Sequence, residues 1–164
     1  MVAPMDATGF QLDRLLPASD EYPMRPIEDA ITWVDGASVD AAAEWYLVVF
    51  RSIRRADVDE VELVRHDDAA HEEAMSAPGF VHYFKGPLSS ERACLSFCLW
   101  TSREAARAAS GMPAHRAAVA FIGDAYDHFT LEFYRARKVA GSLAWTFEPY
   151  DRAPAGSDEV AKAA

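Results

Sequence analysis

Apolar and aromatic residues fall into five short runs, and each run has the composition of a β-strand. The runs cover residues 45–53, 80–84, 93–100, 129–139 and 143–147. They are rich in aromatic and β-branched residues, which favour strands, and turn residues such as glycine and proline separate several of them. The spacing of these runs predicts a β-sheet built from five strands.

Alternation within the third run predicts two sheet faces of different polarity. Leu95, Phe97 and Leu99 fall on one face of this strand, which is fully apolar. Cys94 and Trp100, with Ser96 and Cys98 between them, fall on the other. This second face is semi-polar although it carries a large aromatic ring.

Two segments between the strands carry helical signals. Asp57 is a residue type that caps helix N-termini, and the helix that it starts should end at Pro78. Val58, Val61 and Val64, with Leu63 as a further candidate, would form its apolar stripe. The second helical segment begins at Thr101 and is interrupted before residue 113, where a further helical piece starts.

The resulting order is β-α-β-β-α-β followed by one more strand, which is the split βαβ pattern of the ferredoxin-like fold. We therefore expect a single α+β domain over residues 44–150. Residues 1–43 contain four prolines and should form an arm that packs on this domain. Residues 151–164 are small and polar, which is typical of a flexible tail.

Two helices can cover only one face of such a sheet. The fully apolar face of the third strand should lie under the helices, which would leave the face of Trp100 without a cover. A large exposed apolar patch usually marks a partner or a ligand site. We therefore expect a homodimer in which two copies pack sheet against sheet, with a cavity between sheet and helices or between the two sheets.

The charge of the chain argues against two classes of partner. Its 26 acidic and 16 basic residues give a formal net charge of −10, which disfavours binding to nucleic acids and anionic membranes. The sequence shows no signal-peptide pattern and no transmembrane segment. Cys94 and Cys98, on one strand and roughly 13 Å apart, cannot form a disulfide. Reduced cysteines suit a cytoplasmic protein.

One stretch resembles a known family. Residues 97–105 (FCLWTSREA), followed by residues 113–116 (PAHR), are similar to the strand, Trp, Ser-x-Glu-Ala, helix, Pro-x-His-Arg stretch of antibiotic-biosynthesis monooxygenase domains. The resemblance implies a dimeric α+β barrel. The family includes cofactor-free oxygenases, in which Trp100 would line the cavity, and haem-degrading enzymes, in which a histidine near His115 ligates iron. The haem-degrading members also use an early-strand Asn, which residues 45–53 lack.

Two histidines are candidate catalytic groups. His115 and Val119 are spaced i, i+4, so the imidazole should lie on the buried side of its helix. There it could act as a general base or as an axial haem ligand, or it could be an ordinary hydrogen-bonded histidine. His82 should share a strand face with Phe80 and Phe84, and could flank a ligand together with His115.

Four aromatic residues are candidate walls for a flat substrate, with ordinary packing as the alternative: Tyr83, Phe97, Trp100 and Tyr134. Arg51 could bind an anionic substrate or pair with Glu132. Residues 66–72 (HDDAAHE) could hold a metal ion, because Asp67 and His71 are i, i+4 neighbours on a helix. No zinc-type Cys/His spacing accompanies them, so a solvated acidic helix face is the expected structure.

Two functions follow from these patterns. The first is a cofactor-free oxygenase-like enzyme that binds an aromatic or polycyclic substrate in an apolar cavity of a homodimer. The alternative is a non-catalytic dimeric module that binds haem or a small hydrophobic molecule.

Overall fold

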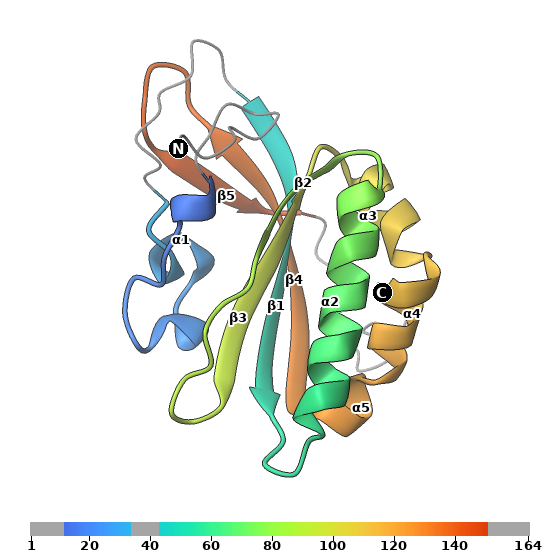
Figure 1. The fold of residues 1–164 in the computed structure, drawn as a ribbon. Coiled ribbons are helices and arrows are strands. Elements are labelled where there is room, and N and C mark those ends of the chain that lie inside the picture. Colours follow the sequence, from blue (N-terminus) through green and yellow to red (C-terminus); the bar gives the residue numbers. More distant parts are fainter. Residues whose placement is uncertain (1–11, 34–42, 151–164) are drawn as a thin grey trace, which may run out of the picture.

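The computed structural model describes residues 12–33 and 43–150. In these residues an antiparallel sheet of five strands has helices along one face and the N-terminal segment along the other (Figure 1). The strand order is β2-β3-β1-β4-β5, in which the first four strands have the ferredoxin-like arrangement and β5 extends the sheet beyond β4. The predicted α+β ferredoxin-like fold with an extra C-terminal strand is confirmed.

The strands are β1 (Ala43–Arg54), β2 (Phe80–Phe84), β3 (Ala93–Trp100), β4 (Tyr126–Lys138) and β5 (Trp145–Pro149). β2 and β3 have the predicted bounds. β4 begins at Tyr126 rather than at residue 129, because it pairs with β1 over most of the length of that strand.

The helices are α1 (Ile27–Ala30), α2 (Glu60–Ser76), α3 (Arg103–Ser110), α4 (Pro113–Ala120) and α5 (Ile122–Ala125), and the short 3-10 turns are η1 (Leu12–Arg14) and η2 (Tyr22–Met24). Asp59 rather than Asp57 caps α2, since its carboxylate accepts two backbone N–H groups at 3.0 and 3.1 Å. Ser102 rather than Thr101 caps α3, and its hydroxyl accepts the Ala105 N–H at 3.1 Å. Both helices therefore start later than predicted.

The helices cover the semi-polar face of the sheet. Tyr46 and Trp100 are buried there against Ala106 and Ala109 of α3. Large rings on the strands thus meet small side chains on the helix, which lets the helix lie close to the sheet. The prediction that the fully apolar face of β3 lies under the helices is wrong.

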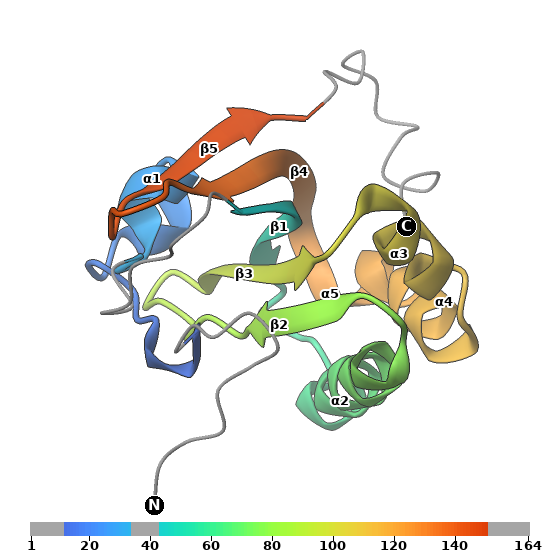
Figure 2. The same cartoon turned by 90° about the horizontal axis from the view of Figure 1, so that it is seen from above.

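The N-terminal segment covers that fully apolar face instead. Leu95, Phe97 and Leu99 have no exposed surface and belong to one cluster with the buried apolar residues of the segment 12–33. The Trp33 ring lies 5.0 Å from that of Phe97 and 4.6 Å from that of Phe147, measured between centroids. Seen from above, α1 and the turns lie across the sheet from α2, α3 and α4 (Figure 2).

Polar contacts fix the segment 12–33 to the sheet. Arg51 donates one hydrogen bond to the Pro23 carbonyl oxygen and another to Glu132, both at 2.6 Å. The Tyr22 hydroxyl donates to the Pro87 carbonyl oxygen at 2.5 Å. At Gly86 a Cβ would overlap both the Leu95 carbonyl oxygen and the Tyr22 hydroxyl oxygen, so only glycine lets the neighbouring strand and the segment approach this closely.

A β-bulge changes the face on which His82 lies. Phe80 pairs with Trp100 but His82 pairs with Leu99, so Val81 is an extra residue in β2. Phe80 therefore packs on the helix side, whereas His82 shares the other side with Phe84. The prediction that these three aromatic side chains share one face is wrong, because strict alternation fails at a bulge.

The α2 stripe also differs from the prediction. Val61 and Val64 are 77% and 45% exposed, while Leu63 is buried. Asp67 faces the sheet, where it accepts a hydrogen bond from the Tyr83 hydroxyl at 2.8 Å and pairs with Lys85. Leu63, the further candidate for the stripe, and the polar anchor at Asp67 therefore hold α2 in place of the valines.

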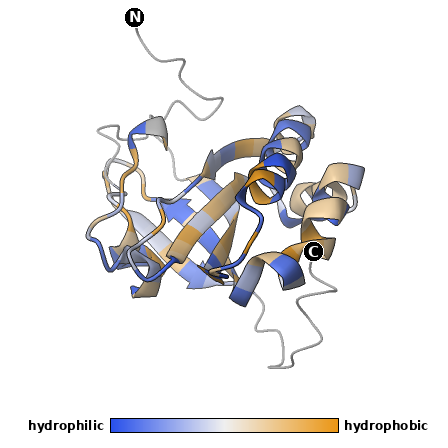
Figure 3. Cartoon of the chain, turned by 60° about the horizontal axis from the view of Figure 1, so that its bottom comes forward, coloured by the Kyte–Doolittle hydropathy of each residue, from blue (hydrophilic) through white to orange (hydrophobic). Residues whose placement is uncertain are grey.

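Apolar residues run along the strands in the middle of the molecule, between the helices and the N-terminal segment (Figure 3). Both faces of the sheet have a cover from the same chain. The homodimer stays a prediction, but the uncovered sheet face that suggested it does not exist in this structure. No helix in the described part of the chain is long and apolar enough to cross a membrane.

We expect Ile27→Ala to lower the free energy of unfolding by roughly 2–5 kcal/mol, because Ile27 is fully buried between the N-terminal segment and the sheet. Leu16→Ala is the matched control: Leu16 lies on the same segment, is 62% exposed, and should change the value by less than about 0.5 kcal/mol. Urea denaturation measures both. Equal effects would mean that the segment does not contribute a packed core.

Candidate functional site

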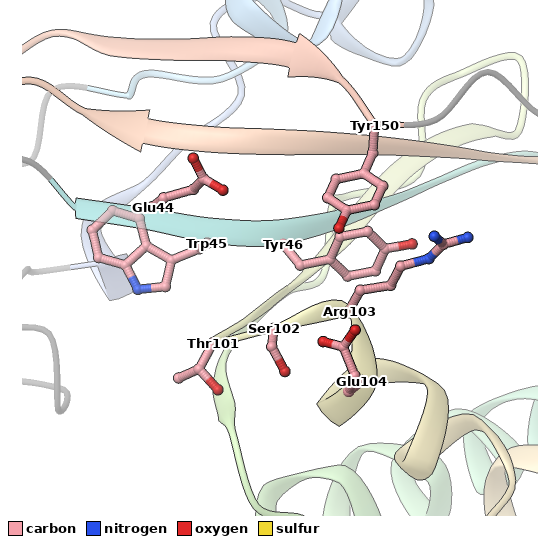
Figure 4. A pocket seen from close by; sticks show the side chains of 8 residues that line it. All are labelled: Glu44, Trp45, Tyr46, Thr101, Ser102, Arg103, Glu104 and Tyr150. Carbon is pink, nitrogen blue, oxygen red and sulfur yellow. The ribbon is translucent and has the colours of Figure 1, made fainter.

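A small pocket lies where β1 begins and where β3 leads into α3 (Figure 4). Its volume is about 150 Å³. The lining residues come from β1, from the start of α3 and from the residue after β5: Glu44, Trp45, Tyr46, Thr101, Ser102, Arg103, Glu104 and Tyr150. Four of them are consecutive in the sequence, so the turn from β3 into α3 shapes one side of the pocket.

That turn is held by the loop that precedes β2. The Thr101 N–H donates to the Gly79 carbonyl oxygen at 2.8 Å. Gly79 has a φ of +85°, and a Cβ there would lie 2.5 Å from the Thr101 hydroxyl oxygen and 2.6 Å from the Ala105 Cβ. Only glycine combines this backbone conformation with so close an approach. The Pro78-Gly79 turn therefore sets the start of α3 and the pocket wall that α3 provides.

Aromatic rings form the apolar part of the site. The Tyr150 ring lies edge-on to that of Tyr46, with 5.0 Å between their centroids, and the Tyr46 ring is nearly parallel to that of Phe133 at 6.1 Å. The Tyr150 N–H donates to the Phe133 carbonyl oxygen at 2.8 Å, which continues the pairing of β4 with β5 by one residue. These edge-to-face rings can pack against a further ring.

Guanidinium groups surround these rings. The central carbons of Arg135 and Arg103 lie 4.5 and 5.2 Å from the centre of the Tyr150 ring. Arg103 also donates a hydrogen bond to the Tyr46 hydroxyl oxygen. Burial raises the pKa of Tyr46, while the positive charges of Arg103 and Arg107 oppose this rise. The site therefore combines apolar ring surface with positive charge.

The two glutamates of the lining differ in their charge balance. Glu44 accepts a hydrogen bond from Arg137 at 2.6 Å, and Arg137 also pairs with Glu148 at 2.9 Å. The Glu44 charge is thus compensated within the sheet. Glu104 is exposed in the first turn of α3, where a negative charge is favourable.

The size of the pocket limits what it can enclose. A cavity of roughly 150 Å³ accepts a molecule about as large as benzene. Haem, which the resemblance to haem-degrading enzymes implies, does not fit here. The pocket is far smaller than the roughly 300–1,000 Å³ of sites for larger ligands, and no histidine or cysteine lines it.

The candidate substrate-binding residues lie on both sides of the sheet. Trp100 and Tyr83 are on the helix side, where Trp100 packs edge-on against Phe80 with 5.4 Å between centroids. Phe97, Tyr134 and Arg51 are on the side of the N-terminal segment.

These five residues therefore cannot line one cavity, and none lines the described pocket. The pairing of Arg51 with Glu132, one of the two alternatives for Arg51, is present. The Tyr134 hydroxyl donates to the same carboxylate at 2.8 Å. Burial, reinforced by Glu132, raises the pKa of Tyr134.

His115 lies in the first turn of α4. The Glu73 carboxylate of α2 accepts the backbone N–H groups of Ala114 and His115 at 3.1 and 3.0 Å, and so caps α4 from a neighbouring helix. The His115 side chain is half-buried. Burial lowers its pKa, and the Glu73 charge opposes this shift.

His82 lies on the other side of the sheet, 6.2 Å from Phe97 between ring centroids. His82 and His115 therefore do not flank one ligand. Their catalytic roles stay predictions, and neither lines the described pocket.

The acidic segment of α2 is only partly solvated. His66 stacks on Phe121 at 4.8 Å, and His71 lies edge-on to Tyr83 at the same distance. Asp67 is the anchor to β2 described above. Within residues 12–33 and 43–150, no group of three or more His, Cys, Asp or Glu side chains could hold a metal ion. Cys94 and Cys98 are both free, as predicted.

The sequence pattern did not single out Tyr46, Arg103, Arg135 or Tyr150 as site residues. One signal was available at Arg103, which occupies the first position of α3. A positive charge is unfavourable at a helix N-terminus, so a functional reason for it can be sought. Tyr150 gave no comparable signal, because its position depends on the register of β5.

We expect acidification to destabilise the wild type more than His115→Gln. Because the folded pKa of His115 lies below its unfolded value, the folded chain binds this proton less readily. The free energy of unfolding therefore begins to decrease as the pH falls through the histidine pKa of the unfolded chain, about 6.5. Urea denaturation between pH 7.5 and 5.5 measures it, with His128→Gln at an exposed histidine of β4 as the control. Identical pH slopes for wild type and His115→Gln would contradict the prediction.

Comparison with solved structures supports the fold. Protein SO0527 from Shewanella oneidensis has a TM-score of 0.51 and 12% identity, covering 58% of this chain and 94% of that one. SnoaB, a cofactor-independent oxygenase from Streptomyces nogalater, has a TM-score of 0.43 and 15% identity, covering 54% and 90%. Such low identities concern the fold alone. Membership in the antibiotic-biosynthesis monooxygenase family stays a prediction.

Sequence comparison identifies the family. The UPF0643 protein PB2B2.08 of Schizosaccharomyces pombe (strain 972 / ATCC 24843) is 28% identical over 109 residues, which cover 63% of this chain and 50% of the relative. The chain thus spans about half the length of this curated relative. A family model described as PB2B2.08-like matches residues 5–149. The chain therefore belongs to the PB2B2.08-like family.

Proposed function

We propose that the protein is a small-molecule-binding protein that holds one aromatic ring of its ligand in the pocket beside α3. The observation that carries this proposal is the group of rings at the pocket, in which Tyr46 and Tyr150 lie edge to face and both line the space. A ligand ring packed against them would gain the favourable geometry of aromatic pairs. This proposal develops the alternative of a binding module for a small molecule, and it excludes haem as the ligand of this pocket.

The volume of the pocket supports one ring rather than several. About 150 Å³ encloses a benzene-sized group, so a polycyclic molecule would have to leave its other rings outside. The walls also favour a defined orientation, because apolar ring surface lies on one side and the polar residues Thr101 and Ser102 line the pocket as well. Polar groups placed beside apolar ring surface are typical of sites that orient a ligand.

Oxygenase chemistry is a second candidate, and the presence of Glu104 beside Arg103 favours it. A cofactor-free oxygenase needs only to take a proton from an acidic substrate and to stabilise the anion that reacts with dioxygen. In such a reaction the substrate gives up two hydrogens, one oxygen atom of dioxygen enters the product and the other leaves as water. Glu104 would accept the proton and Arg103 would face the anion.

Oxygen consumption separates the enzyme from the binding protein. Hydroquinone, a single-ring phenol, would be added to the full chain in an oxygen electrode. Uptake above the uncatalysed rate that falls in Glu104→Gln but not in Glu72→Gln, at an exposed glutamate of α2, would support the oxygenase. Binding of hydroquinone without oxygen uptake would contradict the oxygenase and support the binding function.

We expect benzamide to bind more tightly than cyclohexanecarboxamide by about three- to tenfold, because only the aromatic ring can pack edge to face with the tyrosines. Isothermal titration calorimetry measures both neutral probes. Tyr150→Leu should remove most of this preference.

Tyr134→Leu, at a half-buried tyrosine on the other side of the sheet, is the matched control and should keep the preference. Thermal melts establish that both variants fold. Equal affinities for the two probes, or an equal effect of the two substitutions, would show that the ligand ring does not lie against Tyr150.

A further inference from the structure

Phe133 contacts both tyrosines of the pocket, although it does not itself line the space. Its ring is nearly parallel to that of Tyr46, with 6.1 Å between the centroids and 9° between the planes. Its carbonyl oxygen accepts the Tyr150 N–H at 2.8 Å. One half-buried residue of β4 is therefore connected to both rings that the ligand ring would contact.

We infer that Phe133 is a positioning residue of the binding site, which fixes the edge-to-face arrangement of Tyr46 and Tyr150 that receives the ligand ring. This inference rests on the proposed binding function and names a residue on which the selectivity for an aromatic ring depends. Phe133 acts through the two tyrosines, by its ring on the first and by its main chain on the second.

The register of β1 and β4 places the two parallel rings together. Tyr46 pairs with Arg135, which lies two residues beyond Phe133 on β4. Tyr46 and Phe133 are thus diagonal neighbours on adjacent strands, and such neighbours are within reach of each other when both side chains are aromatic. A register shift of one residue would move the Phe133 ring to the opposite face of the sheet. The pairing that builds the sheet therefore also sets this contact.

The alanine side chains that cover Tyr46 constrain the plane of its ring less. They are Ala106 and Ala109 of α3, whose methyl groups have no plane to match. Two aromatic rings, in contrast, favour particular relative orientations, and centroid separations of about 4.5–7 Å are typical of such pairs. The Phe133 ring therefore orients the Tyr46 ring, which the Tyr150 ring meets at 83°.

The hydrogen bond to Phe133 anchors Tyr150 just after β5. Pro149, the last residue of that strand, has no N–H group with which to pair. The Tyr150 N–H forms the bond to β4 instead, so this residue is held one position beyond the strand with its ring against Tyr46. The Phe133 carbonyl oxygen therefore fixes the point from which the Tyr150 ring reaches the pocket.

Removal of the Phe133 ring tests the inference. We expect Phe133→Leu to bind benzamide about two- to threefold more weakly than the wild type and cyclohexanecarboxamide equally well, because a misplaced Tyr46 ring loses edge-to-face contact only with an aromatic probe. Isothermal titration calorimetry of the full chain measures both probes. The effect should be smaller than that of Tyr150→Leu, since Phe133→Leu keeps the main-chain hydrogen bond.

Phe129→Leu is the matched control. Phe129 is half-buried on the same face of β4, but it packs against Phe50 and Tyr126. Its replacement should leave the ratio of the two affinities unchanged. Phe133→Tyr retains the ring and should keep this ratio as well. Phe133→Met also lacks a ring but fills irregular space well, so it provides the same test if thermal melts show that Phe133→Leu does not fold.

The outcomes separate the role of Phe133 from the binding function itself. If the wild type prefers benzamide and Phe133→Leu keeps that preference, Phe133 does not position the site and the binding function stands. Equal weakening of both probes in Phe133→Leu would show a merely structural role and would overturn the inference in the same way. If the wild type binds the two probes equally, or binds neither, the ring contact of the proposed function fails and the role of Phe133 fails with it.

Discussion

Burial of the fully apolar sheet face by the segment 12–33 is the constraint on which the rest of the structure depends. Leu95, Phe97 and Leu99 lose all their exposed surface only because this segment crosses them. Its packing is apolar in the middle and polar at two anchors, where Arg51 and Tyr22 bind main-chain carbonyl oxygens. Once this face is occupied, the helices must cover the other one, although it is the more polar of the two.

On the helix side, large side chains from the strands consequently pack against small side chains from the helices. Tyr46 and Trp100 bring large rings from the strands, while α3 contributes mainly alanine to the contact. Further down the sheet, α2 is attached through Asp67 and the Tyr83 hydroxyl. The α3 end of this layer is apolar, while the α2 part combines the buried Leu63 with these polar contacts. The pocket lies at the apolar end, where the strand rings reach the start of α3.

The strands and their order could be predicted from the sequence, because alternation and β-branched composition are local properties. The bounds of β2 and β3 needed no tertiary information. The cover of each face could not be predicted in the same way. Both faces of β3 are sufficiently apolar to be buried. Which face the helices cover depends on the segment 12–33, whose prolines interrupt the periodic pattern from which packing could have been predicted.

The candidate site was predicted less well, for two physical reasons. A single extra residue at Val81 moved His82 to the side opposite the helices, and a bulge leaves little trace in a five-residue strand. The residues of the pocket come from three distant parts of the chain, including Tyr150, which reaches it only through the pairing of β4 with β5. Trp100 was predicted to line the cavity, but it is a core residue beside the site.

Arg103 shows how a local exception can indicate a site. In the first turn of a helix its charge opposes the dipole, which an uncharged or acidic residue at this position would not do. Its contacts with Tyr46 and Tyr150 hold the guanidinium at the pocket edge. The Gly79 turn, which fixes the start of α3, keeps this arrangement in place through a backbone conformation that other residues rarely adopt. The turn at Gly79 and the contacts of Arg103 with the two tyrosines therefore act on the same short segment, and together they determine the shape of this edge of the pocket.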